Sequence, residues 1–374
     1  MGILSGNRAR GPDLRILAVN AGSSSLKLRV LGPGDEVLAT HDLPAPTGNV
    51  DSEPLAKILD GLPTIDAVAH RIVHGGERFR GPVRIDAEVE SALRDLADLA
   101  PLHQQKSLAA LDTVSAALPA VPAIACFDTA FHATIPAPAA TYALPAAWRE
   151  RYGLRRYGFH GLSHSYAARR AAEILGNEEL RLVTCHLGSG ASLAAVHAGR
   201  CLDTTMGFTP LEGLVMATRS GSVDPGLLLW LLEREAMSES EMAEALEHES
   251  GLLALAGTAD MREVVSGAER GEERSQLALD VYIHRLKAMI ASMAAALGGL
   301  DALAFTGGVG ENSAAVRAAA TDGLAFLGLS IDANRNSAAH SDTDIGVADL
   351  GASVLVIESR EDLEMARQLR SLAI

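Results

Sequence analysis

Two arginines lie among apolar and glycine residues, and this placement suits them to binding anions. Arg71 stands in AHRIVHGG (69–76) and Arg219 in ATRSG (217–221). A guanidinium keeps its charge and binds carboxylate or phosphate oxygens through two parallel hydrogen bonds. Asp128 ends the apolar run in CFDT (126–129), where a carboxylate can face a cleft or cap a helix. The alternative interpretation of Arg71 and Arg219 is that they are ordinary surface arginines exposed to solvent.

Two histidines, His160 in FHG and His186 in CHLG, each stand beside a glycine at the expected end of an element. Their ring nitrogens are suitable donors to phosphate or carboxylate oxygens, and satisfied core histidines are the alternative. Neither has the HExxH spacing of a zinc-binding helix, so a zinc site is not expected.

Three glycine-rich segments follow apolar runs: NAGSSSLK (20–27), HLGSGAS (186–192) and TGGVGEN (306–312). Small residues let backbone N–H groups approach an anion, and the third segment also opens a helix. None matches the P-loop or the Rossmann fingerprint. Together the three segments favour phosphate binding, although any one alone could be an ordinary hairpin turn.

The elements around these segments repeat. We predict a strand over 14–20, a turn and a returning strand over 26–31, and the same design over 181–186 and 193–197. Gly22 then aligns with Gly188. This weak internal repeat indicates a duplicated domain whose halves each begin with a hairpin.

Further strands and helices alternate along the chain, which predicts an α/β protein with mixed sheets covered by helices. Strands are expected at 67–70, 123–127, 302–305 and 354–358, and a glycine turn at 306–310. Helices are expected at 88–99, 106–118, 165–175, 225–232, 273–297, 313–326 and 361–372. We expect a flexible leader over 1–12, a first domain of 13–131 plus 361–374, and a second domain of 132–360.

Composition limits the classes of partner. A chain of 374 residues with 48% hydrophobic and 21% charged residues suits two globular domains. Its net charge of −15 argues against nucleic acid or an anionic membrane as partner. The expected compartment is the cytoplasm, because neither a signal peptide nor a membrane span is evident. The three cysteines lack a CxxC pair and predict buried thiols.

Eight motifs together resemble those of the acetate kinase (acetokinase) family, over residues 14–369. In chain order they are LAVNAGSSSLK, HRIVHGGERF, APLH, CFDTAFHATIP, RRYGFHGLSH, HLGSGAS, TTMGFTPLEGLVMATRSGSVDP and FTGGVGEN. The resemblance implies two similar domains of the sugar kinase/Hsp70/actin (ribonuclease H-like) type, with mixed sheets flanked by helices and an interdomain cleft. It implies reversible, direct in-line transfer of the ATP γ-phosphoryl group to acetate, giving acetyl phosphate and ADP. Mg²⁺ would assist, with Mn²⁺ as a possible substitute, and the second domain would bind nucleotide and form a homodimer.

The resemblance also implies roles for individual residues. The catalytic positions are Arg71, Asp128, His160 and Arg219. The acetate pocket comprises Arg71, Val73, Leu102, Phe159 and Pro210. The nucleotide positions are Lys27, His186, Leu187, Gly188, Ser189, Gly190, Asp260, Met261, Arg262, Gly308, Val309, Gly310, Glu311 and Asn312. The Mg²⁺ positions are Asn20 and Glu361.

Three departures from the family pattern lie mainly on the nucleotide side. Ser189 replaces the Asn of HLGNG, and Leu162 replaces the Thr of GTSH. Arg360-Glu361-Asp362 replaces NEE, which places a cation beside Glu361 while Asp362 could share its role.

Three alternatives were weighed. A kinase for propionate or butyrate would differ only in its acyl pocket. A hydroxyl kinase would need an aspartate base, and although Asp128 alone does not exclude it, the motifs along the whole chain do. A nucleotide-gated binding module of the actin or Hsp70 kind would need the glycine turns but not Arg71, His160 and Arg219.

Overall fold

The computed structural model describes residues 14–22, 25–44, 52–96, 101–340, 342–347 and 351–372, without the side chains of 52–54 and 101–103. The chain divides into two units, one of 1–131 with 360–374 and one of 132–359. The expected leader, 1–12, lies outside the described residues.

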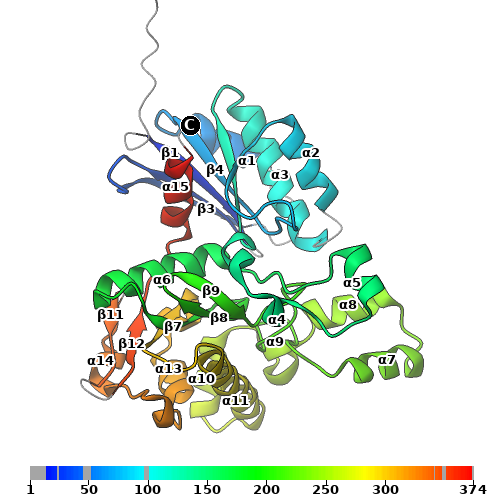
Figure 1. Cartoon of the computed structure of the whole chain (residues 1–374), viewed down its shortest axis with the longest axis vertical. Coiled ribbons are helices and arrows are strands. Elements are labelled where there is room, and N and C mark those ends of the chain that lie inside the picture. Colours follow the sequence, from blue (N-terminus) through cyan, green and yellow to red (C-terminus); the bar gives the residue numbers. More distant parts are fainter. Residues whose placement is uncertain are drawn as a thin grey trace, which may run out of the picture. The chain divides into compact units, whose positions relative to one another are not determined.

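The first unit is built on a six-stranded mixed sheet in the order β3-β2-β1-β4-β6-β5 (Figure 1). Strands β1, β2 and β3 form an antiparallel meander, β1, β4 and β6 run parallel, and β5 is antiparallel to β6. The strands are β1 (Ile16–Ala21), β2 (Ser25–Leu31), β3 (Val37–Pro44), β4 (Ala67–Ile72), β5 (Val83–Arg84) and β6 (Ala123–Phe127).

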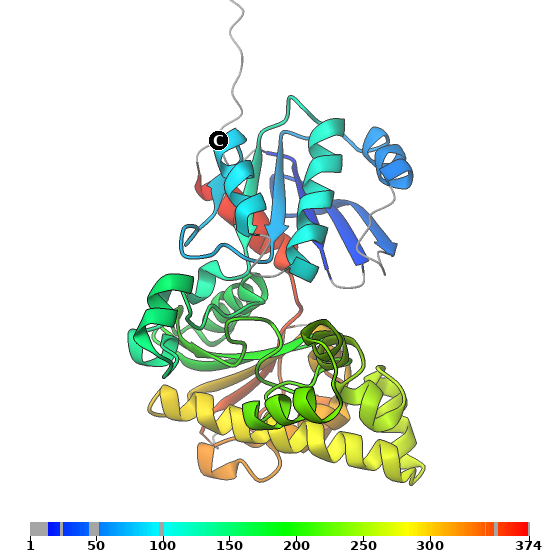
Figure 2. The ribbon, with the colours of Figure 1, turned by 90° about the vertical axis from the view of Figure 1, so that its right-hand side faces the viewer.

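Helices cover both faces of this sheet (Figure 2). They are α1 (Ser52–Asp60), α2 (Ala87–Asp95), α3 (Pro101–Ala117) and α15 (Glu361–Ser371). Side chains alternate between the faces of a strand. Leu17 and Val19 of β1 pack with Leu55 of α1 and Val114 of α3, so Asn20 points to the other face, where α15 lies.

The second unit repeats this topology. Its strands are β7 (Arg181–Leu187), β8 (Ala191–His197), β9 (Arg200–Thr204), β10 (Ala302–Thr306), β11 (Thr343–Asp344) and β12 (Ser353–Val356). The sheet order is β9-β8-β7-β10-β12-β11, with an antiparallel meander, parallel central strands and an antiparallel edge. The duplicated two-domain fold is therefore confirmed, and the two hairpins that the sequence predicts occupy equivalent places.

Helices of the second unit surround its sheet. Before β10 they are α4 (Ala137–Ala140), α5 (Ala146–Tyr152), α6 (Gly161–Leu175), α7 (Pro225–Arg234), α8 (Glu239–His248), α9 (Gly251–Ala256), α10 (Met261–Glu269) and α11 (Glu273–Ala296). After β10 they are α12 (Gly307–Asn312), α13 (Ala314–Thr321) and α14 (Ala333–Ser337), with 3-10 helices η3 (Ala130–Thr134) and η4 (Ala325–Leu327). The long helix α11, yellow in Figure 2, buries Ile283, Leu286, Ile290 and Met293 along one stripe, as its periodicity predicts.

The prediction of a glycine turn over 306–310 is wrong, because the chain enters helix α12 directly at Gly307. Gly307 has φ +79°, and a Cβ there would lie 2.8 Å from the carbonyl oxygen of Leu187. Three glycines give this segment a low helix propensity. The Glu311 carboxylate nevertheless accepts a hydrogen bond from the Gly307 amide at 2.9 Å and stabilises the first turn.

The helix predicted over 313–326 is also shorter than expected. Helix α13 ends at Thr321, and Gly323 follows with φ +80°, a conformation that favours glycine and does not continue a right-handed helix. The apolar residues beyond it belong to η4. In the described part of the chain, no helix is both long and apolar enough to cross a membrane.

Candidate active site

In the first unit, three predicted site residues lie at the carboxyl edge of the sheet. Asn20, Arg71 and Asp128 stand at or just past the ends of β1, β4 and β6, which are neighbouring parallel strands. The Asp128 amide also donates to the Ile72 carbonyl, 3.0 Å away, and so continues the pairing of β6 with β4. Carboxyl ends of parallel strands are the usual place for ligands in α/β sheets.

Asp128 fixes the guanidinium of Arg71. Nε lies 3.0 Å from Oδ1 and Nη2 lies 2.6 Å from Oδ2, with side-chain exposures of 12% for Arg71 and 1% for Asp128. Arg71 Nη1 also donates to Asn20 Oδ1 at 3.1 Å and to the Ala21 carbonyl at 3.3 Å. Burial lowers the pKa of Arg71, but the charges of Asp128 and Glu361 outweigh this effect and raise it above its ordinary value. Arg71 is therefore a permanent cation held in one orientation.

The two predicted metal ligands lie together on the same edge. Asn20 Nδ2 donates to Glu361 Oε2 at 2.5 Å, and Glu361 is the first residue of α15. Arg360 forms a bidentate pair with Asp362, with both distances 3.0 Å, so the Asp362 carboxylate is engaged by the unusual arginine.

Among the described residues, no three His, Cys, Asp or Glu side chains are grouped to hold a metal. Mg²⁺ commonly binds one or two protein oxygens and completes its shell with phosphates and water. The amide and carboxylate oxygens of Asn20 and Glu361 fit that pattern.

In the second unit, the glycine turn between β7 and β8 brings a histidine and an arginine close together. A Cβ on Gly190 would lie 3.1 Å from His160 Nε2 and 3.5 Å from Arg219 Nη1. The rings of His160 and His186 stack with centroids 4.4 Å apart. The His160 ring and the Arg219 guanidinium thus lie against the same glycine, where a side chain would crowd them.

Backbone and side-chain contacts hold the segment that carries Pro210 and Arg219. Arg219 Nη1 donates to the Pro210 carbonyl at 3.2 Å, and the Ala217 amide donates to the Ser189 carbonyl at 3.1 Å. Upstream, Glu212 accepts from Tyr142 at 2.5 Å and from Arg156 at 2.7 Å. Burial, followed by the hydrogen bond to Glu212, raises the pKa of Tyr142 above its usual range, so its hydroxyl stays protonated.

Helix α12, which carries five predicted nucleotide positions, is held at both ends. Glu311 Oε1 accepts from the amides of Gly307 and Ser359, each at 2.9 Å. Arg317, 2% exposed, donates to the carbonyls of Gly310 and Glu311 at 2.9 and 2.7 Å. A Cβ on Gly308 would meet no atom within 4 Å, so the helix has open space there.

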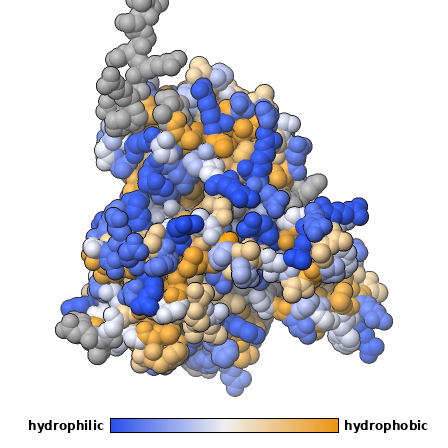
Figure 3. Space-filling model, viewed as in Figure 1, coloured by the Kyte–Doolittle hydropathy of each residue, from blue (hydrophilic) through white to orange (hydrophobic). Residues whose placement is uncertain are grey.

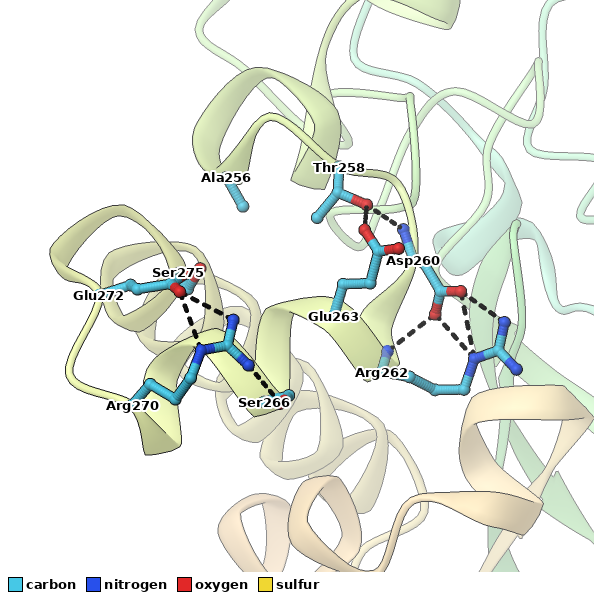
Figure 4. Close-up of a pocket in the computed structure, with 9 residues that line it drawn as sticks. All are labelled: Ala256, Thr258, Asp260, Arg262, Glu263, Ser266, Arg270, Glu272 and Ser275. Atoms are coloured by element: carbon cyan, nitrogen blue, oxygen red, sulfur yellow. Dashed lines mark hydrogen bonds and ion pairs between the residues drawn. The ribbon is translucent and has the colours of Figure 1, made fainter.

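The predicted adenosine positions begin α10, where Asp260 caps the helix and forms a bidentate pair with Arg262. Both line an open, polar pocket of about 530 Å³ with Thr258, Glu263 and Arg270 (Figure 4). Met261 between them is 5% exposed and packs inward.

The remaining predicted positions differ in exposure. Phe159, Pro210 and Val73 are buried, whereas Lys27 is exposed on β2 opposite Asn20. The Leu102 side chain lies outside the described part. Leu187 and Leu162 are buried, and Ser189 is exposed at the tip of the turn.

Sequence reasoning missed several buried polar residues that hold the site. The Gln104 side chain accepts from the backbone amide of His74 at 3.1 Å and donates to its carbonyl at 3.2 Å. The Thr129 hydroxyl accepts from the Gly75 amide at 3.0 Å. These contacts fix the turn that follows Arg71. A polar residue inside an apolar segment could have indicated a buried hydrogen bond. Its partner could not be identified from the sequence, because the two residues are 30 or 54 positions apart.

The chain is similar in sequence and fold to several known proteins. A model described as the acetokinase family matches residues 48–367. The acetate kinase of Gloeobacter violaceus is 51% identical over 308 residues, which cover 81% of this chain and 76% of that protein. The crystal structure of Porphyromonas gingivalis acetate kinase has a TM-score of 0.87 and 35% identity, covering 96% of this chain and 99% of that one. A propionate kinase structure from Francisella tularensis has a TM-score of 0.88 and 34% identity, covering 95% and 98%.

Proposed function

This chain belongs to the acetokinase family, and from that premise we propose that it transfers the γ-phosphoryl group of ATP reversibly to acetate. The products are acetyl phosphate and ADP. The observation that carries the proposal is the approach of His160 Nε2 and the Arg219 guanidinium to Gly190 in the turn that follows β7.

The obstacle to this reaction is electrostatic, because an anion must approach a polyanionic phosphate. Acetate is ionised at neutral pH and needs no general base. Positive charge and in-line alignment are therefore what the protein must supply. Arg71, held by Asp128, would bind and orient the carboxylate. His160 and Arg219 would donate to oxygens of the transferring phosphoryl group as charge develops there.

Mg²⁺, with Mn²⁺ as a possible substitute, would be held by Asn20 and Glu361 and would supply positive charge to the phosphates when bound. Asp128 is already engaged by Arg71. We give Asp128 an orienting role, which also argues against a hydroxyl kinase that uses it as a base.

We expect the nucleotide to be bound by His186, the turn over 187–190, Lys27, helix α12 and the start of α10. Rigid support of α12 by Glu311 and Arg317 favours this assignment.

A propionate kinase is the second candidate, because a propionate kinase structure resembles this chain as closely as an acetate kinase structure does. One methylene changes binding in an apolar pocket by only about 1–3 kcal/mol. We therefore expect acetate to be preferred and propionate to be a poorer substrate.

We also propose a homodimer formed through the second unit. Helix α7 buries none of its residues in the chain and exposes Leu229 and Trp230 by 69% and 55%. Apolar side chains are visible in the region of α7 in Figure 3. A second copy of the chain would cover them. All three cysteines are buried free thiols, which suits the cytoplasm, and the net charge of −15 disfavours nucleic-acid and membrane partners.

The test is to incubate purified protein with ATP, Mg²⁺ and acetate, and to trap acetyl phosphate as its hydroxamate. Propionate and butyrate are run in parallel. Acetate-dependent product, with acetate well ahead of butyrate, supports the proposal. Arg219→Ala should lower kcat/KM by roughly 10²–10³-fold, the scale for loss of a charge-stabilising donor. Folded protein that binds nucleotide but phosphorylates no acid would favour the binding-module alternative.

A further inference from the structure

The loop that connects β9 to α7 carries a carboxylate that accepts two side-chain hydrogen bonds. Residues 205–224 are all described and form neither helix nor strand. Within them, Glu212 Oε2 accepts from the Tyr142 hydroxyl at 2.5 Å, and Glu212 Oε1 accepts from Arg156 Nη2 at 2.7 Å. A long loop without a regular backbone ladder depends on side-chain contacts for its conformation. Glu212 is thus a point at which this loop is held.

The Tyr142 hydroxyl joins Glu212 to the backbone of the loop. The Phe208 amide donates to Tyr142 Oη at 2.9 Å. An amide N–H can only donate, so the single hydroxyl proton of Tyr142 must lie towards the other partner, the Glu212 carboxylate. Burial, followed by the hydrogen bond to Glu212, raises the pKa of Tyr142, which keeps that proton in place. The partners therefore allow only one direction for each of these bonds.

Arg156 joins the same carboxylate to the start of the loop. Its Nη1 donates to the carbonyls of Thr205 and Met206 at 3.2 and 3.0 Å, and its side chain is only 17% exposed. The amides of residues 157–158 then donate to the Gly207 carbonyl at 3.0 and 3.2 Å. The segment that follows Arg156 is therefore bound to the loop through side chain and backbone alike.

The packing at Gly207 shows how closely these side chains fit the loop. A Cβ at this position would lie 1.7 Å from Glu212 Oε2 and 2.2 Å from Tyr142 Oη. Both distances are far shorter than a non-bonded contact of a carbon atom, so a side chain at 207 would displace the carboxylate. The hydroxyl, the carboxylate and the loop backbone therefore pack as one rigid block.

Two residues that we propose for the acetate pocket lie on the two sides of this block. Phe159 directly follows the segment whose amides bind the loop, and Pro210 lies two positions before Glu212. Both Phe159 and Pro210 are buried. We infer that Glu212 is a positioning residue that fixes the separation of Phe159 and Pro210, and thereby sets the size of the acid that the chain accepts. This inference rests on the proposed function and adds what makes its acyl pocket selective.

A pocket wall that is held in place discriminates between acids more sharply than a wall that can move. One methylene changes kcat/KM in an apolar pocket by about 10–200-fold, and that factor depends on walls that do not yield to the larger acid. When the hydrogen bonds of Glu212 are lost, the wall at Pro210 can move outward and the penalty for propionate decreases. The preference for acetate over propionate therefore depends on Glu212 and its two partners.

The test measures kcat/KM for acetate and for propionate in the full chain, in Tyr142→Phe and in Glu212→Gln, with ATP and Mg²⁺ saturating. We expect the acetate-to-propionate ratio to fall about tenfold in both variants, the scale of one buried hydrogen bond, while KM for ATP stays unchanged. Tyr152→Phe, which changes an exposed tyrosine of α5, is the matched control and should keep the parent ratio. A parent chain that prefers acetate, with the same ratio in both variants, would overturn the inference alone.

Amide hydrogen exchange tests the positioning without any substrate. In Tyr142→Phe, peptides that cover 205–212 and 156–159 should exchange about tenfold faster than in the parent chain, whereas peptides of α11 should keep the parent rate. Equal exchange everywhere, or faster exchange that includes α11, would contradict the positioning role. A parent chain that phosphorylates no acid would overturn the proposed function together with the inferred specificity.

Discussion

At the scale of single residues, the Arg71–Asp128 pair is the strongest electrostatic feature of the first unit. Both side chains are almost inaccessible, and the carboxylate accepts three hydrogen bonds from the guanidinium. Burial of two charges is costly, and only their mutual contact offsets it. We therefore expect the buried ion pair to be kept because it orients Arg71 towards an anionic substrate. The stability of the first unit then depends on both Arg71 and Asp128 being present.

Removing one partner tests this account. Asp128→Ala should lower the free energy of unfolding of the first unit by up to about 3–5 kcal/mol, because the buried Arg71 cation would lose its ion-pair partner and keep only the charge of Glu361. Denaturant unfolding measures the change. Glu88→Ala breaks an ion pair whose glutamate is 81% exposed and should cost less than about 1 kcal/mol. If both variants lost the same free energy of unfolding, the buried ion pair would stabilise the chain no more than the exposed one.

Buried histidines predict loss of stability in acid. Burial lowers the pKa of His70 to about 3 and of His74 to about 4, and burial likewise lowers the pKa of His132 to about 4. Below the unfolded value near 6.5 the unfolded chain binds protons that the native chain does not. Stability is therefore full above about pH 6.5 and falls as pH drops towards 4, by up to about 1.4 kcal/mol per pH unit for each such histidine.

His70 allows a direct check of this window. It is 1% exposed, and neither ring nitrogen has a hydrogen-bond partner among the described residues. In His70→Leu, the fall in Tm between pH 6.5 and 4 should be shallower than in the parent chain. His284→Leu, an exposed histidine, should leave the slope unchanged. An identical slope in His70→Leu would mean that His70 does not titrate in this way.

At the scale of elements, α12 shows how contacts override propensity. The segment GGVGEN contains three glycines, yet Glu311 satisfies its first amide and Arg317 satisfies two carbonyls at its end. The Gly310 carbonyl is buried and the other two groups are partly buried, so leaving them without these partners would cost up to about 1–3 kcal/mol each. The helix exists because two side chains complete its ends.

Arg317→Met should therefore loosen α12 and weaken nucleotide binding more than acetate binding. We expect the Kd of ATP to rise about tenfold, because two buried carbonyls lose their donor. Calorimetric titration with ATP and Mg²⁺ measures it. Arg335→Met, which changes an exposed arginine of α14, is the control. If Arg317→Met bound ATP as tightly as the control variant does, the contacts of Arg317 with α12 would not matter for nucleotide binding, and the prediction would be wrong.

At the scale of the whole molecule, the two units share one strand order, and the second differs mainly by its added helices α7 to α11. Among these, α7 (PGLLLWLLER) is capped at Asp224 but buries no residue against the chain. Exposed apolar side chains on α7 are the basis on which we propose an interface there.

Leu229→Lys should therefore convert the proposed dimer to monomer, because a charge would be buried against the second copy. Sedimentation or light scattering reads the mass directly. Phe326→Lys changes an equally exposed apolar residue, at 74%, and should leave the mass unchanged. A monomeric parent chain, or a dimer that persists in Leu229→Lys, would contradict this interface.

The sequence by itself determined eight of the twelve strands in the described part of the chain, the hairpin repeat and the residue types of the site, whereas β3, β5, β9 and β11 were not predicted. Local patterns encode these features: apolar runs mark 16–21 and 302–306, and glycine marks the turn at 188–190. The motifs also sufficed for the family and for Arg71, Asp128, His160 and Arg219 as candidates.

Only the tertiary structure decided what holds these residues. Arg71 pairs with Asp128, 57 positions away, and hydrogen bonds link Thr184 to His160, 24 positions away, through His164 and Ser192. Arg317 of α13 binds the carbonyls of Gly310 and Glu311 in α12, seven and six positions away. Such partners are chosen by strand register and packing, which depend on the whole unit. The same reason explains why a turn was predicted over 306–310, although helix α12 begins at Gly307.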